Sequence, residues 1–187
     1  MMTYRELGEE DLDMYYRVLH EGYQTDKKYP ISFSAITATR EQERIWLASN
    51  PTYGLFEDGE LVSALSLRMP WGPNPGPEGV PHIGQVVTAP EHMHKGYASK
   101  LIGLVTEEVL KQQLKVPFVT LGTATSHPWL RKMYEKLGFR AVKCSCRASS
   151  IEPFIFAKTS HEVFFVVLPA VDSCRKRSDR LTLGPAR

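Results

Sequence analysis

An apolar strand pattern that runs into a glycine-containing loop and then into an amphipathic helix is the feature that most constrains this chain. The strand pattern covers residues 83–87, the loop follows it, and the helical pattern begins near residue 97. The first N–H groups of a helix have no partner within the helix and carry the positive end of its dipole. A small residue at such a corner, as Gly96 and Ala98 are here, lets a phosphate approach the backbone closely. The sequence therefore predicts an anion site at this corner, suited to a pyrophosphate.

Length and composition indicate a single globular unit. The chain has 187 residues, of which 42% are hydrophobic and 24% charged, which is enough for one buried core and short for two domains. The formal net charge of +2 does not demand a nucleic-acid partner. We therefore expect one domain over residues 1–169, followed by a basic, disordered tail at residues 170–187.

The cysteines and the N-terminal segment bear on the compartment of the protein. Cys144, Cys146 and Cys174 are an odd number without metal-ligand spacing, which is typical of reduced thiols. The N-terminal segment lacks the apolar run of a signal peptide, and no segment approaches membrane-spanning length. We expect a cytoplasmic protein without a membrane partner, a nucleic-acid partner or a metal. A homodimer is left open.

Hydrophobic periodicity predicts alternating strands and helices along the chain. Asp58-Gly59 between two strand patterns predicts a hairpin, because these residues supply the positive φ angles of a two-residue type I′ turn. Before the corner, the predicted elements are a strand at 3–7, a helix from Leu12 to Tyr23, a helix that starts at Thr39 or Arg40 and stops before Pro51, hairpin strands at 53–57 and 60–68, and a proline- and glycine-rich loop at 70–81. After it, they are a strand at 118–121, a helix at 128–137 closed by Gly138, and strands at 139–147 and 162–168.

Two segments resemble motifs of the GNAT family of acetyl-CoA-dependent N-acetyltransferases. The first, Met93-His94-Lys95-Gly96-Tyr97-Ala98, is similar to the motif A loop Gln/Arg-x-x-Gly-x-Gly/Ala, which in the family follows a strand ending in Val-x-Pro. Here the loop follows Thr88-Ala89-Pro90. The second segment, Leu130 to Phe139, resembles the pattern Ala-x-x-x-Tyr-Glu-Lys-x-Gly-Phe, with one predicted strand between the two motifs. The resemblance is close from Ile83 to Val142.

The resemblance implies a fold and a reaction. The fold would be the GNAT fold of the α/β (α+β) class, with a central mixed, mostly antiparallel twisted sheet flanked by helices on both faces. The chain would be an enzyme with acetyl-CoA as co-substrate. A primary amine would attack the thioester directly, so that no nucleophilic cysteine is required.

The same resemblance assigns the corner to the cofactor. Backbone N–H groups of the loop would hold the pyrophosphate, and the preceding strand would pair with the pantetheine as an added half-strand. The predicted cofactor-binding residues are Val86, Val87, Thr88, Met93, His94, Lys95, Gly96, Tyr97, Ala98, Ser99 and His127. The alternative for His94 and Lys95 is a solvated turn, and His127 would be a helix cap, a cofactor contact or a surface residue. Met93 replaces the family's Gln or Arg, which removes a polar side chain but keeps the backbone donor.

Two residues are candidates for acid–base chemistry. Tyr134 matches the tyrosine that protonates the leaving thiolate in many GNAT enzymes, and a phenol with a pKa of about 10 suits that role. The alternative is a core tyrosine, because Tyr134 lies in an apolar stripe. His82 begins the strand that lines the family's acceptor site and titrates in the range of a general base. The alternatives are a structural histidine with a water chain as base, or Glu78 in the proline-rich loop.

The acceptor is predicted to be a small amine. Tyr23, Tyr29, Phe33 and Trp71 would wall a pocket at the acetyl end of the cofactor, and the prolines near Trp71 would hold a fixed shape. This favours a small primary amine or an amino-acid-like acceptor. The alternatives are a protein lysine or N-terminus, and a non-catalytic acyl-CoA-binding module, against which the presence of Tyr134 argues.

Overall fold

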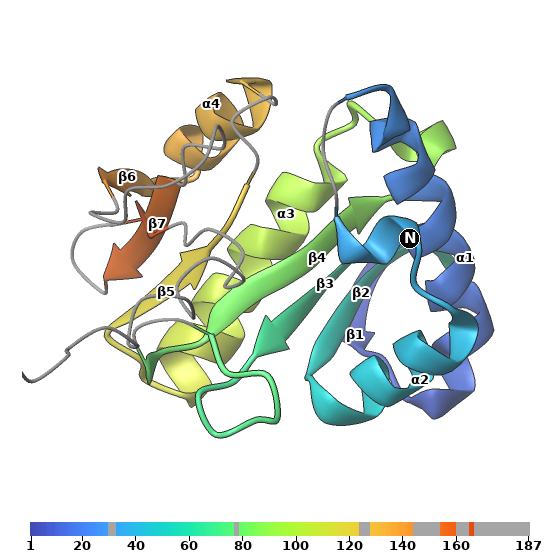
Figure 1. Cartoon of the computed structure of the whole chain (residues 1–187), viewed down its shortest axis with the longest axis horizontal. Coiled ribbons are helices and arrows are strands. Elements are labelled where there is room, and N and C mark those ends of the chain that lie inside the picture. The colour runs from blue at the N-terminus through green and yellow to red at the C-terminus, as the bar shows by residue number, and fades with distance from the viewer. Residues whose placement is uncertain (30–32, 77–78, 124–127, 144–153, 160–164, 167–187) are drawn as a thin grey trace, which may run out of the picture.

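The computed structural model describes residues 1–29, 33–76, 79–123, 128–143, 154–159 and 165–166. Within these ranges the chain forms one sheet with helices on both of its faces (Figure 1). The strands are β1 (Met2–Glu6), β2 (Thr52–Glu57), β3 (Glu60–Arg68), β4 (His82–Thr88), β5 (Phe118–Leu121), β6 (Arg140–Lys143), β7 (Phe154–Thr159) and β8 (Phe165–Val166). The α-helices are α1 (Leu12–Gln24), α2 (Arg40–Ser49), α3 (Tyr97–Leu104) and α4 (Pro128–Lys136). A π-helical segment, η6 (Val105–Gln113), continues α3.

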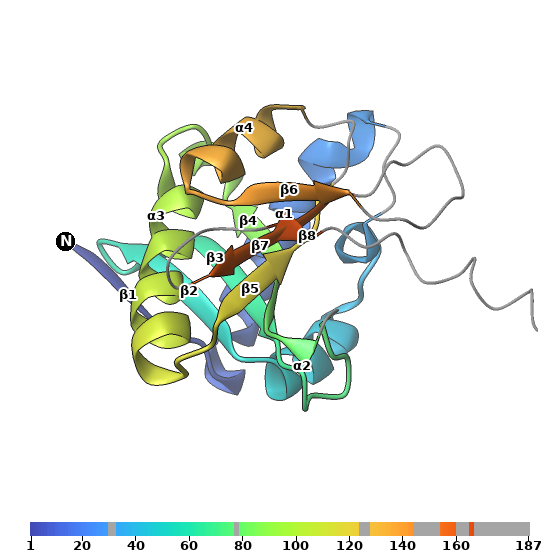
Figure 2. The same cartoon turned by 90° about the vertical axis from the view of Figure 1, so that its left-hand side faces the viewer.

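The sheet is mixed and mostly antiparallel, as expected. Its strand order is β1-β2-β3-β4-β5-β7-β6-β8. Strands β4 and β5 are parallel and pair at two positions, His82 with Thr120 and Ile83 with Leu121. Beyond Ile83 the two strands diverge, so that β1 to β4 and the later strands form two arms of the molecule (Figures 1 and 2). This divergence opens the sheet where the predicted anion corner begins.

Apolar side chains pack on both faces of the sheet in two clusters, because successive residues of a strand point to opposite faces. The cluster beneath α3 and η6 includes Leu55, Val62, Leu65, Leu67, Ile83, Leu101, Ile102, Val105, Tyr134 and Phe139. The cluster beneath α1 and α2 includes Leu12, Tyr15, Val18, Leu19, Leu47, Phe56, Leu61, Ala64 and Val87. The two clusters fix α1 on one side of β4 and α3 on the other.

Local sequence signals set several element boundaries. Asp58 and Gly59 have φ angles of 51° and 88°, as a type I′ turn requires. The Thr39 side chain accepts a hydrogen bond from the Gln42 backbone, and the Gln42 side chain accepts one from the Thr39 N–H, which starts α2 at Arg40. The predicted hairpin and second helix are therefore confirmed.

The C-terminal strands differ from the sequence-based expectation. The predicted strand at 139–147 corresponds to β6, which begins at Arg140, and that at 162–168 to the short β8. Residues 144–147, 162–164 and 167–168 of these predictions lie outside the described residues, as do Cys174 and the tail. Strand β7 was not predicted. It pairs with β5 on one side and with β6 on the other, so distant neighbours stabilise it rather than a local pattern. In the part of the chain that the structure describes, no helix is both long and apolar enough to span a membrane.

Candidate active site

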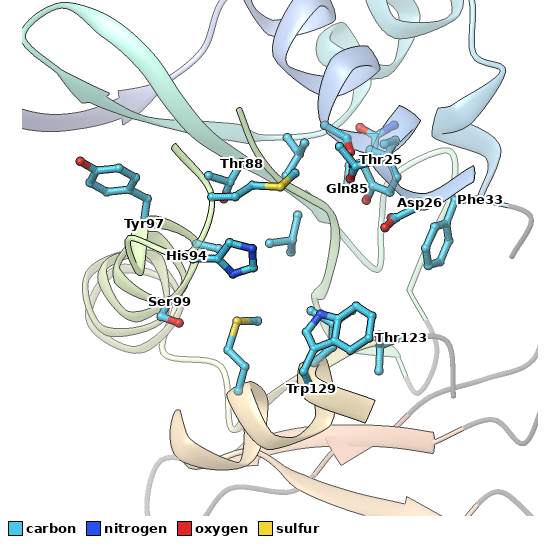
Figure 3. A pocket seen from close by; sticks show the side chains of 18 of the residues that line it. Thr25, Asp26, Phe33, Gln85, Thr88, His94, Tyr97, Ser99, Thr123 and Trp129 are labelled. Carbon is cyan, nitrogen blue, oxygen red and sulfur yellow. Dashed lines mark hydrogen bonds between the residues drawn. The ribbon is translucent and has the colours of Figure 1, made fainter. Parts of the chain in front are cut away.

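A cavity of about 640 Å³ lies where β4 and β5 diverge (Figure 3). Its walls come from the end of α1 and the segment after it, from β4, from the anion corner, and from α4. Nine of the eleven predicted cofactor-binding residues line it: Val86, Val87, Thr88, Met93, His94, Gly96, Tyr97, Ala98 and Ser99. Lys95 does not line the cavity, and His127 lies outside the described residues.

The corner has the backbone geometry that an anion needs. His94 and Gly96 have φ angles of 64° and 83°, so two left-handed residues flank Lys95. The Lys100 N–H donates to the Gly96 carbonyl at 3.0 Å, as in a regular helical turn. The N–H groups before it, at the start of α3, have no acceptor within the helix. A Cβ atom on Gly96 would meet no atom within 4 Å, so open space lies over this backbone. The corner thus fits a phosphate group held by main-chain donors.

The side chains of the corner divide between the cavity and the core. Tyr97 and Ala98 both line the cavity, but Tyr97 is buried and its hydroxyl donates a hydrogen bond to Glu57, whereas Ala98 is half-buried. The exposed Lys95 has its Nζ 3.4 Å from Nδ1 of His92. The side-chain charge predicted at Lys95 therefore lies beside the corner rather than in the cavity wall.

A β-bulge shapes the strand that faces this corner. Ser66 of β3 pairs with Gly84 and Ala64 pairs with Val87, so two residues of β4 stand opposite the single Leu65. Gln85, one of the two, has a φ angle of 46°. A bulge re-aims the backbone groups of its strand, here at the point where β4 enters the cavity wall.

Tyr134 lies both in the core and in the cavity wall. Its side chain is 4% exposed and lines the cavity. The helix that carries it ends in a Schellman motif: the Gly138 N–H donates to the Glu135 carbonyl and the Phe139 N–H to the Tyr134 carbonyl, both at 3.0 Å. Gly138 has a φ of 79°, which confirms it as the residue that closes the helix. Burial raises the pKa of the Tyr134 phenol well above its ordinary value, so the hydroxyl keeps its proton.

His82 has a different environment from the one predicted for a general base. It is 9% exposed, its Nδ1 lies 2.8 Å from Oγ1 of Thr120, and it does not line the cavity. Burial, with a smaller contribution from the charge of Arg68, lowers the pKa of His82 to about 3. A histidine this buried and this weakly basic fits a structural role between β4 and β5, and the geometry argues against proton abstraction.

The aromatic wall of the acceptor end is only partly the predicted one. Tyr23, Tyr29 and Phe33 line the cavity, and the ring centroids of Tyr23 and Phe33 lie 5.6 Å apart. Trp71 does not: it is 73% exposed and lines a separate cavity of about 240 Å³. The fourth aromatic residue at this end is Trp129 of α4, whose ring lies 5.3 Å from that of Tyr29, across the cavity from the end of α1. Glu78 lies outside the described residues.

Two further residues that shape this end were not among the predicted site residues. Asp26 is the one carboxylate among the described residues that line the cavity, and it points inward near Phe33 (Figure 3). Gly22 brings α1 against β4, since a Cβ atom there would lie 2.3 Å from Cγ2 of Val87. A glycine inside an amphipathic helix was a signal for such a close approach, whereas no local pattern distinguishes Asp26 from a surface residue.

Tyr23 connects the two sides of this end electrostatically. Burial raises the pKa of its phenol, and the neighbouring Tyr134 and the Asp26 carboxylate raise it further. Tyr23, Tyr134 and Asp26 all line the same cavity. The cavity thus brings together a protonated phenol from α4, a second phenol from α1 and a carboxylate.

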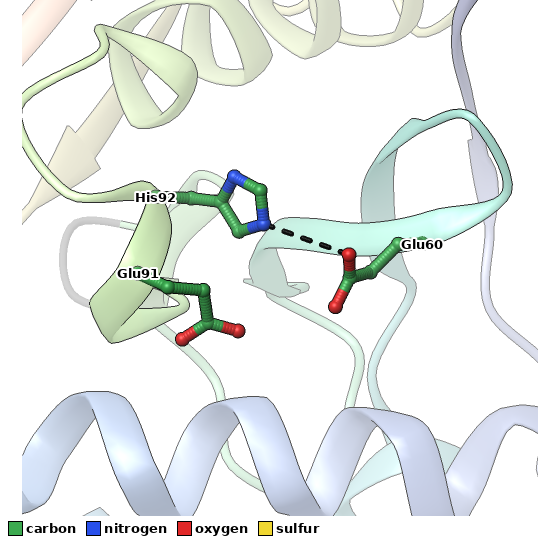
Figure 4. Close-up of side chains that lie close together, drawn as sticks. All are labelled: Glu60, Glu91 and His92. Carbon is green, nitrogen blue, oxygen red and sulfur yellow. Dashed lines mark ion pairs between the residues drawn. The ribbon is translucent and has the colours of Figure 1, made fainter.

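A second group of side chains with metal-ligating atoms lies beside the cavity (Figure 4). One ligand atom each from Glu60, Glu91 and His92 lies within 4.8 Å of the others, and Nε2 of His92 is 3.7 Å from Glu60. Arg17 also approaches Glu60, at 3.9 Å, and both glutamates are exposed. Both carboxylates are exposed and Glu60 already approaches Arg17, so we assign no site to them.

Comparison with known proteins identifies relatives of the chain. Residues 11–139 match the model of the acetyltransferase (GNAT) family. The chain is 40% identical over 136 residues to S-(2-succino)cysteine N-acetyltransferase of Bacillus subtilis (strain 168), which covers 73% of this chain and 82% of the relative. It is 31% identical over 131 residues to S-alkylcysteine N-acetyltransferase of the same strain, which covers 70% of this chain and 74% of the relative.

Solved structures share the fold at low sequence identity. The PaiA N-acetyltransferase from Thermoplasma acidophilum in complex with coenzyme A superposes with a TM-score of 0.66 at 18% identity, covering 85% of this chain and 99% of the other. The putative acetyltransferase yncA from Salmonella typhimurium, solved with acetyl-CoA, has a TM-score of 0.67 at 15% identity, covering 93% and 99%. With the family model matched over residues 11–139 and with these relatives, the chain belongs to the acetyltransferase (GNAT) family and is an N-acetyltransferase.

Proposed function

We propose that this protein transfers the acetyl group of acetyl-CoA to the α-amino group of a small amino-acid derivative, with S-substituted cysteines as the first candidates. One observation carries the proposal: a single cavity joins the phosphate corner to an aromatic end that holds one carboxylate. The two Bacillus subtilis relatives, named for N-acetylation of S-(2-succino)cysteine and S-alkylcysteine, narrow the acceptor class.

The cofactor end would be held mainly by the main chain. Acetyl-CoA supplies an activated acetyl thioester. The N–H groups from His94 to Ser99 would hold its pyrophosphate, and the β4 backbone beyond Ile83, where β5 has diverged, would pair with the pantetheine. Main-chain donors explain why Met93 can replace a polar residue at the first position of the loop.

The acceptor end would recognise an amine and the carbon atoms of the substituent on sulfur. Asp26 would accept a hydrogen bond from the acceptor's ammonium group and would take its proton, directly or through water. Tyr29, Phe33 and Trp129 would pack against the substituent on sulfur. In this proposal Asp26 replaces His82 as the candidate general base, because Asp26 lines the cavity and His82 does not.

Tyr134 would return a proton to the departing thiolate. Its raised pKa keeps the phenol protonated at neutral pH, so the proton is present when negative charge develops on sulfur. Direct attack by the amine needs no metal, and we expect a chelator to leave turnover unchanged.

A screen of acceptors tests the proposal. Purified protein is incubated with acetyl-CoA and S-(2-succino)cysteine, S-methylcysteine, cysteine, free lysine or lysine-containing peptides, and free thiol and N-acetylated product are measured. Cysteine is scored by product mass, since its own thiol would raise the thiol signal. We expect S-substituted cysteines to react fastest and the N-acetylated form of S-methylcysteine, which has no free amine, to be inert. Faster turnover of peptides would contradict the acceptor class, and turnover of none of these amines would contradict the proposal as a whole.

A further inference from the structure

Gln85 stands at the bulge of β4 in a backbone conformation that its residue type disfavours. Its φ angle of 46° lies in the left-handed region, where side chains other than glycine are uncommon. It also lines the cavity (Figure 3). A non-glycine residue persists in such a conformation when its surroundings hold it there.

The Gln85 side chain is held from both sides by buried groups. Its Nε2 donates to both carboxylate oxygens of Glu43, at 3.2 and 3.1 Å. Its Oε1 accepts a hydrogen bond from the Tyr15 hydroxyl and lies 3.4 Å from Oγ of Ser66. A carboxylate can only accept hydrogen bonds, so Glu43 fixes which end of the amide faces α2 and which faces Tyr15.

These partners belong to rigid elements of the core. Tyr15 of α1 is 0% exposed and Glu43 of α2 is 3% exposed. Ser66 of β3 also accepts a hydrogen bond from Nε1 of Trp46 at 2.9 Å and lies 2.9 Å from Oγ1 of Thr52. These hydrogen bonds around Gln85 therefore connect α1 and α2 to the bulge of β4.

Glu43 is costly to keep in this place. Burial disfavours its charged form and raises the pKa of its carboxyl group, and the hydrogen bond from Gln85 offsets this only in part. An apolar side chain of similar size would avoid this cost. Glu43 does not line the cavity, so it has no contact with substrate that would account for it.

We propose that Glu43 and Tyr15 are positioning residues, which hold Gln85 in its left-handed conformation and thereby fix the direction of the β4 backbone at the reacting end of the cavity. If they release Gln85, the bulge relaxes and the backbone groups of Gln85 and Val86 turn away from their positions in the cavity wall. The expected loss is larger in the rate of transfer than in cofactor affinity, because the corner around Gly96 would keep its contacts with the pyrophosphate while only the pairing of β4 with the pantetheine shifts. The inference rests on the N-acetyltransferase activity and not on the identity of the acceptor.

Glu43→Leu tests this by removing the acceptor of the Gln85 amide at similar side-chain volume. We expect kcat to fall about 10-fold, the Kd for acetyl-CoA to stay within about threefold, and hydrogen exchange of the amides of residues 84–88 to accelerate. Glu43→Gln, whose carbonyl oxygen can still accept from Gln85, should keep kcat within about threefold of wild type. Glu41→Leu, an exposed position on the same helix, is the matched control and should behave as wild type.

Three results would overturn the proposal. Wild-type kcat in a folded Glu43→Leu protein would make Glu43 a purely structural residue. Equal loss in Glu43→Gln and Glu43→Leu would show that the charge of Glu43 matters and not its hydrogen bond. If Glu43→Leu does not fold, Tyr15→Phe removes the opposite hydroxyl, and unchanged kcat in that variant would overturn the proposal. Failure of every acceptor with wild-type protein contradicts the proposed function instead, while hydrogen exchange of residues 84–88 still tests the bulge.

Discussion

The backbone carbonyl of Tyr134 accepts a hydrogen bond from the Phe139 N–H at 3.0 Å, and the two rings meet edge to face with their centroids 6.0 Å apart. The same residue pair thus closes α4 through its main chain and packs through its side chains. Phe139 is 2% exposed, so the contact anchors Tyr134 from the core side. This leaves the Tyr134 ring fixed while it lines the cavity.

Tyr134→Phe should lower turnover without loss of cofactor binding. The ring and its contact with Phe139 remain, but the proton for the thiolate is removed, so we expect kcat to fall by roughly 10- to 1,000-fold, with water as a substitute acid. The Kd for acetyl-CoA should stay within a few fold. Tyr4→Phe removes a phenol hydroxyl that bonds to Glu108 outside the cavity and serves as the control. Unchanged turnover in Tyr134→Phe, at equal folded fraction, would leave Tyr134 as a core residue only.

Gly96→Glu should abolish acetyl-CoA binding in a folded protein. The new side chain would enter the open space over the corner, bring negative charge to the phosphate position, and force a φ of 83° on a residue other than glycine. Gly59→Glu is a matched control, because Gly59 has a φ of 88° and open space around it but lies at the hairpin turn. Calorimetry should show loss of binding in Gly96→Glu alone. Equal affinities in the two variants would contradict the assignment of the corner.

Asp26→Asn should weaken use of the acceptor and not of the cofactor. The amide keeps the shape of the side chain but cannot take a proton from the acceptor's ammonium group, so we expect kcat/KM for the acceptor to fall by about 10- to 100-fold. Asp13→Asn, at an exposed position on α1 where Asp13 pairs with Arg40, provides the control. Steady-state kinetics with each substrate varied in turn would show whether kcat/KM falls more for the acceptor than for acetyl-CoA. A larger effect on acetyl-CoA than on the acceptor would exclude the proposed role.

His82→Gln should make the fold less sensitive to acid. The folded protein binds the His82 proton with a pKa of about 3, whereas an unperturbed histidine binds it near 6.5. Between these values the unfolded state binds more protons, so the free energy of unfolding falls as the pH falls from 6.5 towards 3, by at most about 1.4 kcal/mol per pH unit for one group. Glutamine can still bond to Thr120 but does not titrate, so this contribution disappears.

Urea unfolding at several pH values between 4 and 7, about one unit apart, would measure how the free energy of unfolding changes with pH in wild type and in His82→Gln. Turnover of His82→Gln at neutral pH should stay within about threefold of wild type per folded molecule. A loss of more than about 100-fold in a folded variant would restore His82 as the general base.

Features that depend on a few consecutive residues could be read from the sequence. The turn at Asp58-Gly59, the start of the second helix at Thr39 or Arg40 and the helix end at Gly138 follow from backbone preferences of the residues themselves, and the structure confirms each. The corner around Gly96 belongs to this class as well, because a strand, a loop and a helix start lie within one short stretch of chain. Local chemistry therefore predicted the anion corner and several element boundaries, and the resemblance of two segments to GNAT motifs implied the family and the sheet class.

The acceptor end was decided by tertiary structure. Asp26 and Trp129 lie far apart in the sequence and meet in one cavity because β4 and β5 diverge and α4 packs across the gap. The same packing buries His82 against Thr120 and places Trp71 at another cavity, which reversed two sequence-based expectations. Burial and orientation are sums over contacts between distant segments, and a periodicity measured along the chain carries no information about them.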